Sequence, residues 1–296
     1  VTAEQLTATV ERARDLLLKG ALAGDRKAGL ALRKELRQLD EWLLEPFRVE
    51  MGSARLLAVR PTQALHYVPF AALLGKDGKY QVERQATVDL VKGADLTLLT
   101  RTARSRPKSL FAFGNPDGSL PGATLEVEEI AAQFGGVKPS VGEAATSERL
   151  RTMDPTTGYL HLATHGILVP QDPRQSYLVM ARSRLRTADI YALNLSRVGL
   201  VTLSACNTAV QEKNPGAEVH SLAEAFSVAG GQSVLASLWS VSDEGTRALM
   251  VRFYQEVLKG QSLGEGLRRA QLSLLRDPRF AHPFFWASFT LLGDWR

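Results

Sequence analysis

Hydrophobic residues in the first part of the chain recur at helical spacing. From Ala3 to Leu44 there is no proline, and apolar side chains return every three or four positions, interrupted by three glycines between residues 20 and 29. The pattern predicts a helical hairpin within residues 1–45. Two roles fit its apolar stripes: packing onto the rest of the protein, or continuing a helical array outside this chain.

The pattern changes after Pro46, where short runs of β type begin. These runs occupy residues 55–59, 65–74 and 80–91. A helical pattern over residues 95–103 follows, and then a basic stretch around Pro107 that has the composition of a solvated connector. We therefore expect a second segment, residues 46–106, in which a sheet begins.

Beyond residue 106, patterns of buried strands and helices alternate to the end of the chain. Strands are predicted at residues 110–113, 159–163, 177–181, 199–203, 233–238 and 287–291. Helices are predicted at residues 123–134, near 188, and at 221–229, 243–258 and 263–275. This order predicts an α/β fold over residues 107–296, with a largely parallel sheet covered on both faces. In such folds the functional site lies at the carboxyl ends of the strands.

Two of these strand ends carry reactive side chains. The buried run over residues 159–163 leads into Thr164-His165-Gly166, and the run over residues 200–203 leads into Ser204-Ala205-Cys206. A thiol becomes an effective nucleophile when an imidazole within hydrogen-bond reach takes its proton. The placement is typical of a thiol hydrolase. The alternative is that Cys206 is a small buried apolar residue and His165 a hydrogen-bonded polar one.

Composition excludes several other classes of protein. Lysine and arginine number 36 against 31 aspartates and glutamates, an excess too small to indicate nucleic-acid binding without a basic stripe. No apolar run approaches the roughly 20 residues that cross a bilayer, so no membrane partner is expected. There is no phosphate-binding loop, zinc helix or Gly-x-Ser-x-Gly elbow, so neither a cofactor nor a metal is expected.

The cysteine content and the start of the chain bear on the cellular location of the protein and on its length. The single cysteine excludes an internal disulfide and favours a reducing, cytoplasmic location. No signal peptide is present at the start, and the first residue is Val1, so we expect the chain to be a piece of a longer protein.

Several motifs in register resemble one known family. They are His161-Leu-Ala-Thr-His165-Gly166, Leu203-Ser-Ala-Cys206-Asn-Thr208, Val234-Leu-Ala-Ser-Leu-Trp239-Ser-Val-Ser-Asp243, His282-Pro283-Phe-Phe-Trp286, and, upstream, Leu65-His-Tyr-Val-Pro69 and Gly114-Asn-Pro116. Together they resemble the CHAT domain, a family of caspase-like cysteine peptidases in the clan of caspases and separase. One departure follows the cysteine, where the family often has Glu-Thr-Gly and this chain has Asn207-Thr208-Ala209.

The resemblance implies a caspase-like three-layer sandwich, preceded here by the helical hairpin, with residues 46–106 as a degenerate half and residues 107–296 as the catalytic half. It also implies that His165 is the catalytic histidine and Cys206 the nucleophile, with the backbone N–H groups of Gly166 and Cys206 as the oxyanion hole. Ser204 and Trp239 are candidate substrate-binding residues.

Three hypotheses for function follow. The first is a cysteine endopeptidase that cleaves a protein partner and is regulated by upstream helical repeats or by a bound activator, because members of the family often follow such repeats. The second is a catalytically silent member of the family that serves as a protein-interaction module. The third is a thiol hydrolase or transferase acting on a small molecule.

Two expectations concern selectivity and regulation. Asp243 lies where the resemblance to separase implies an acidic pocket, which predicts cleavage after arginine or lysine, although Ser242 and Asp243 also suit the start of a helix. The polar segment over residues 209–219 predicts a mobile loop, and Lys213 within it is a candidate for self-cleavage. If this loop must become ordered to complete the substrate groove, the isolated chain will be weakly active. The alternative is an ordinary solvent-exposed connection.

Overall fold

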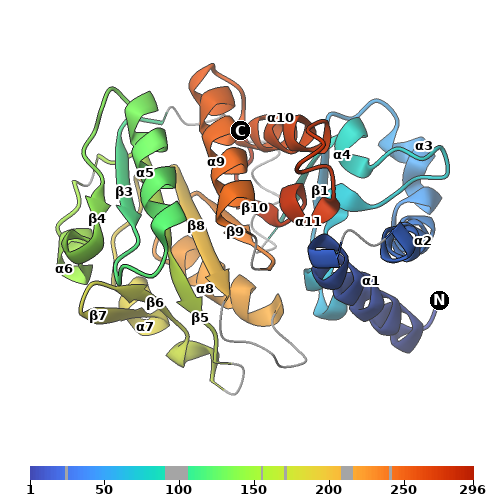
Figure 1. The fold of residues 1–296 in the computed structure, drawn as a ribbon, viewed down its shortest axis with the longest axis horizontal. Coiled ribbons are helices and arrows are strands. Elements are labelled where there is room, and N and C mark those ends of the chain that lie inside the picture. Colours follow the sequence, from blue (N-terminus) through green and yellow to red (C-terminus); the bar gives the residue numbers. More distant parts are fainter. Residues whose placement is uncertain (24–25, 91–105, 155, 170–171, 208–215, 240–241) are drawn as a thin grey trace.

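The computed structural model describes residues 1–23, 26–90, 106–154, 156–169, 172–207, 216–239 and 242–296, in which helices cover both faces of a mixed β-sheet (Figure 1). The strands are β1 (Leu56–Val59), β2 (Ala86–Asp89), β3 (Leu110–Gly114), β4 (Ser140–Val141), β5 (Tyr159–Ile167), β6 (Tyr177–Met180), β7 (Ser183–Arg186), β8 (Leu200–Asn207), β9 (Ser233–Ser237) and β10 (Phe289–Gly293). The α-helices are α1 (Ala3–Ala23), α2 (Arg26–Leu43), α3 (Arg48–Met51), α4 (Gln81–Arg84), α5 (Pro121–Gln133), α6 (Ser147–Arg151), α7 (Thr187–Tyr191), α8 (Gly216–Val228), α9 (Asp243–Leu258), α10 (Leu263–Leu275) and α11 (Pro283–Trp286).

The strand order places two groups of strand ends at opposite edges of the sheet. The order is β1-β2-β10-β9-β8-β5-β3-β4, and β6 joins β5 and β7 outside this path. All neighbouring pairs in the main path are parallel except β10 with β9. The carboxyl ends of β3, β5, β8 and β9 therefore meet at one edge, and those of β1, β2 and β10 lie at the other. The predicted largely parallel sheet is confirmed.

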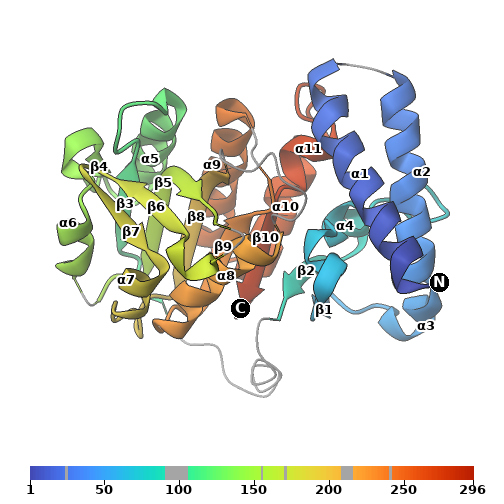
Figure 2. The same ribbon diagram turned by 90° about the horizontal axis from the view of Figure 1, so that it is seen from below.

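Two hydrophobic cores, one on each face of the sheet, make the fold a three-layer sandwich. Side chains of β5 alternate between them: Tyr159 and Ala163 pack with α5, α9 and α10, while Leu160 and Leu162 pack with α6, α7 and α8. Figure 2 shows the two helical layers on either side of the strands. A strand that is buried on both faces reads as a continuous apolar run, which is why these strands could be located from the sequence.

The predicted helical hairpin is confirmed, and it packs against the body of the protein. Helices α1 and α2 lie side by side (Figure 2). Leu17 and Leu36 are buried in the same core as Trp286, and the carbonyl of Leu36 accepts a hydrogen bond from Leu74 N–H. No helix in the described ranges has both the length and the apolar character needed to span a membrane.

The predicted strand over residues 65–74 is wrong. Two 3₁₀ turns, Gln63–Tyr67 and Phe70–Ala72, occupy this segment instead. Pro69 between them has no N–H to offer a strand neighbour, and Gln63 has a left-handed backbone with φ of 50°. The run is apolar because it is buried under the hairpin, and burial alone does not distinguish a strand from a compact turn.

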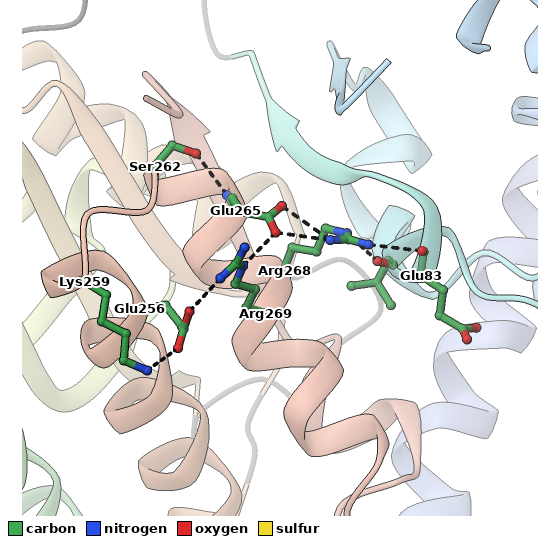
Figure 3. Close-up of polar contacts among 8 residues, drawn as sticks. Glu83, Glu256, Lys259, Ser262, Glu265, Arg268 and Arg269 are labelled. Carbon is green, nitrogen blue, oxygen red and sulfur yellow. Dashed lines mark hydrogen bonds and ion pairs between the residues drawn. The ribbon is translucent and has the colours of Figure 1, made fainter. Parts of the chain in front are cut away.

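Helix α10 holds the short helix α4 beside the sheet (Figure 3). Arg268 donates to the carbonyl oxygens of Val82 (2.8 Å) and Glu83 (3.1 Å) and pairs with Glu265, which also binds Arg269. These contacts hold α4, which occupies part of the predicted β run over residues 80–91, beside β2. The predicted segments 46–106 and 107–296 therefore share one sheet, and the boundary between them stays a prediction.

Candidate active site

The candidate catalytic pair lies on two adjacent parallel strands. Strand β5 pairs with β8 in a register that sets the Cα of His165 opposite that of Cys206. This pairing lies at the carboxyl end of both strands, where the sequence placed it. Since parallel neighbours at equal register lie about 4.8 Å apart, the two residues meet across the ladder.

Both strands extend further than predicted. They were expected to end before Thr164 and Ser204, but β5 continues to Ile167 and β8 to Asn207. The extension of β5 follows from a second partner, because Gly166 and Ile167 also pair with the antiparallel strand β6. His165 therefore stands within a strand rather than on a loop after it, and its backbone is fixed on both sides.

The His165 side chain is held by the loop between β3 and α5. Its Nε2 atom lies 2.6 Å from Ser119 Oγ and 4.0 Å from Asp117 Oδ2, and the side chain is 16% exposed. Ser119 and Asp117 were not found by sequence analysis. The available signal was the Gly114-Asn-Pro116 motif, which shows that the loop is a family feature but not that its tip contacts a histidine 46 residues later.

Local hydrogen bonds give this loop one shape. Asn115 has a left-handed backbone, with φ of 51°, and its side chain accepts from Leu120 N–H at 2.7 Å and donates to Thr124 Oγ1 at 3.2 Å. Gly118 also has a positive φ of 79°, which glycine adopts without strain. The loop thus spans from the end of β3 to the start of α5 with its tip turned toward His165.

Asp117 is held in its ionised form. Partial burial works against the charge, but hydrogen bonds from the Ser119 hydroxyl and backbone N–H, together with the nearby imidazole of His165, leave the pKa of Asp117 below its usual value. A carboxylate that stays charged beside an imidazole favours the imidazolium form of that imidazole. This is the electrostatic setting that a general base needs when it takes a proton.

A buried polar network lies deeper on the same two strands. His161 Nε2 lies 2.9 Å from Glu126 Oε1, and its Nδ1 lies 3.2 Å from the hydroxyl of Tyr254. That hydroxyl lies 2.8 Å from Thr202 Oγ1, and Thr202 is the register partner of His161. Burial raises the pKa of Tyr254 far above its usual value, so its hydroxyl stays neutral. The network links β5 and β8 to α5 and α9, and it gives His161 a structural role in the core.

Asp243 lies close to the start of α5. Its neighbour Ser242 is the N-cap of α9, because its hydroxyl accepts from Gly245 N–H at 3.4 Å. The Asp243 carboxyl is exposed and lies against Gly122, where a Cβ atom would come within 2.6 Å of Asp243 Cγ. Gly122 follows Ser119 by three residues, so the structure brings Asp243 and His165 to the same connection between β3 and α5.

The other candidate residues are placed as follows. Ser204 is buried on β8 opposite Ala163. Trp239 is only 5% exposed and donates its indole N–H to the carbonyl of Phe284, an arrangement that gives it a packing role. Gly166 lies on β5 opposite Asn207. Roles for these residues in substrate or oxyanion binding stay predictions.

The loop predicted over residues 209–219 is contradicted at its C-terminal end. Helix α8 already begins at Gly216, so the last part of the loop expected over residues 209–219 is helical. Lys213 and the rest of that loop lie outside the described residues. Among the residues that are described, no group of three His, Cys, Asp or Glu side chains is placed to hold a metal ion.

The fold is that of the caspase-like α/β class, as two solved structures show. The Saccharomyces cerevisiae separase–securin complex aligns with a TM-score of 0.55 at 14% identity, covering 78% of this chain and 15% of that one. The Arg-specific cysteine proteinase gingipain R aligns with a TM-score of 0.59 at 10% identity, covering 92% of this chain and 68% of that one. At these identities the likeness establishes the fold alone.

The chain belongs to the CHAT domain family, which it matches over residues 33–294. Among curated proteins it is similar to tetratricopeptide repeat protein 28 of Mus musculus, with 27% identity over 91% of this chain. The Homo sapiens protein of the same name is 25% identical over the same share. The chain spans 14% of the mouse relative and 13% of the human one.

Proposed function

We propose that the chain is a cysteine endopeptidase in which Cys206 is the nucleophile and His165 the general base and acid. The observation that carries the proposal is the register of β5 and β8, which sets the two residues opposite each other at the carboxyl edge of the sheet. Membership of the CHAT family and the likeness in fold to two cysteine peptidases support it.

The chemistry follows from the two side chains. The thiol proton moves from sulfur to the imidazole, and the thiolate attacks the scissile carbonyl to form a tetrahedral oxyanion. Backbone N–H groups of Gly166 and Cys206 are proposed to stabilise this oxyanion, each contributing about 3 kcal/mol. Collapse expels the amine, which takes the proton from the imidazole, and water then hydrolyses the thioester.

A covalent probe tests this function without knowledge of the natural substrate. Because Cys206 is the single cysteine, a peptide carrying a thiol-reactive group can label only this residue among thiols. We expect the native chain to be labelled much faster by the peptide probe than by the same reactive group without a peptide, and the Cys206→Ala chain not to be labelled. Equal rates with and without the peptide would contradict a peptide-binding active site.

A second function is favoured by the curated relatives. Their name describes repeat proteins and no peptidase, so a catalytically silent interaction module is the alternative. In either case we propose that upstream helical repeats or an activating protein act through the hairpin of α1 and α2, because its leucines are buried in the core that also holds α9 and α10. The probe distinguishes the two functions, since a silent module would show no peptide-dependent labelling.

Asp243 is proposed to select a basic residue before the scissile bond. Its exposed carboxylate lies beside the connection that holds His165. We expect Asp243→Asn to lower the preference for an arginine over a glutamine substrate at least about tenfold, because the charge-assisted pairing is lost. Paired fluorogenic peptides measure this ratio, and the matched control is Glu244→Gln, which removes the neighbouring charge in the same helical turn. An unchanged ratio in Asp243→Asn would exclude the residue from the specificity pocket.

A further inference from the structure

The Ser119 hydroxyl lies between a carboxylate and an imidazole. Its Oγ is 2.7 Å from Asp117 Oδ1 and 2.6 Å from His165 Nε2. A hydroxyl has one hydrogen to donate, and an ionised carboxylate accepts only. The Ser119 hydrogen must therefore point to Asp117, and the remaining lone pairs of Oγ face the imidazole.

This arrangement determines which nitrogen of His165 carries a proton. Since Ser119 Oγ accepts at that contact, Nε2 must be the donor and hold its hydrogen. In a neutral imidazole the other nitrogen, Nδ1, then carries the basic lone pair.

The serine is itself held in place. Its backbone N–H donates to the same oxygen, Asp117 Oδ1, at 3.1 Å, so the turn closes around the carboxylate. The Asn115 side chain also bridges the two ends of the loop, so hydrogen bonds within the loop support this geometry.

We propose that Asp117 and Ser119 are positioning residues that fix His165 in its Nε2–H form and stabilise the imidazolium formed during catalysis. This rests on the proposed function and adds a third component to the Cys206–His165 pair. When the S–H bond of Cys206 breaks, its proton binds Nδ1 and the electron pair stays on sulfur. The positive charge on the ring is then balanced by Asp117, whose Oδ2 lies 4.0 Å from Nε2. The leaving amine later takes the proton from Nδ1.

The first test needs no enzyme activity. In the Cys206→Ala chain with ¹⁵N-labelled histidine, we expect the imidazole shifts of His165 to show the Nε2–H tautomer. Adding Asp117→Asn or Ser119→Ala should shift the ring toward the Nδ1–H form, whereas Ser119→Thr should preserve the Nε2–H form because the hydroxyl remains. A control is available in Asp154→Asn, since Asp154 Oδ1 accepts from Thr156 N–H and Oγ1 (both 2.7 Å) in the same type of turn away from His165.

The second test measures the reactivity of the Cys206 thiol. Alkylation of Cys206 by iodoacetamide, measured by intact mass, reports the thiolate population of this one cysteine as pH is varied. We expect Asp117→Asn to shift the profile to higher pH and to lower the rate below about pH 7 roughly tenfold, as the imidazolium that favours the thiolate is lost. For peptide cleavage we expect kcat to fall about tenfold to a hundredfold with KM unchanged. Asp154→Asn should match the native chain in both assays.

The outcomes separate this inference from the proposed function. An Nδ1–H tautomer in the Cys206→Ala chain, or an Nε2–H form that Asp117→Asn and Asp154→Asn leave equally unchanged, would overturn the positioning role even in an active peptidase. A chain that shows the Nε2–H form and loses it in Asp117→Asn, yet is never labelled by a peptide probe, would contradict the peptidase function and leave the assignment of Asp117 and Ser119 intact.

Discussion

Cys206→Ala and His165→Ala are each expected to reduce peptide cleavage by at least about a thousandfold while leaving the fold unchanged. The loss follows because a thiol without a base, or a base without a nucleophile, cannot form the acyl intermediate. Stability should change little, since both changes lie at the carboxyl ends of β5 and β8. Steady-state kinetics measure the first effect, and circular dichroism with thermal unfolding measures the second.

A matched substitution guards against a general effect of removing a histidine. His66 lies in the 3₁₀ turn Gln63–Tyr67, in the part of the chain under the hairpin. His66→Ala should retain cleavage within a few-fold of the native rate. Cleavage by Cys206→Ala at a rate near that of the native chain would remove Cys206 as the nucleophile.

The stability that Asp89 contributes is expected to be lost as pH rises from about 4 to 7, and Asp89→Asn should remove this loss. Asp89 ends β2 and is buried, with a hydrogen bond from Thr290 Oγ1 at 3.0 Å. Burial raises its pKa from 3.8 to about 7, against the opposing effect of that hydrogen bond. Because the folded state holds the proton more tightly, the contribution to stability is complete below pH 4 and is lost as pH rises through 7.

The pKa shift of Asp89 sets the size of its effect on the free energy of unfolding. A pKa raised by about three units corresponds to ~4 kcal/mol of unfolding free energy between the protonated and ionised limits. An asparagine is neutral at every pH and keeps an oxygen for Thr290, so Asp89→Asn should be more stable than the native chain above pH 7. Urea unfolding at several pH values measures this. Asp154→Asn serves as an exposed control, and a native pH slope retained in Asp89→Asn would assign it to other groups.

Strands could be located from the sequence where burial on both faces gives a continuous apolar run. β5 and β8 are apolar on both faces, so residues 159–163 and 200–203 could be recognised as strands from the sequence. Their last residues were missed because Thr164, His165 and Ser204 are polar. The short strand β7 was also missed, since its pattern Ser183–Arg186 is polar and it pairs only with β6. Strand pairing, rather than hydrophobicity, holds these residues in the sheet.

Only part of the candidate site could be found from the sequence, because some of its residues carry a local signal and others do not. His165 and Cys206 belong to motifs that identify the family, and each lies near the carboxyl end of a strand that can be located. Ser119 carries no such signal, because its role depends on the distance between Oγ and a ring nitrogen from another strand. Asp243 was a candidate from the resemblance, but its contact with Gly122 depends on tertiary structure, because α9 packs beside α5.

By itself, the sequence determined the α/β class, the helical hairpin, the strands of the central sheet and the family. These properties depend on local periodicity and on short motifs, which neighbouring residues encode. Only the tertiary structure decided the alignment of His165 with Cys206, the contact of Ser119 and Asp117 with the imidazole, and the burial that raises the pKa of Asp89. Those properties depend on register and on distances between residues far apart in the chain, which are set when the helices and the sheet pack together.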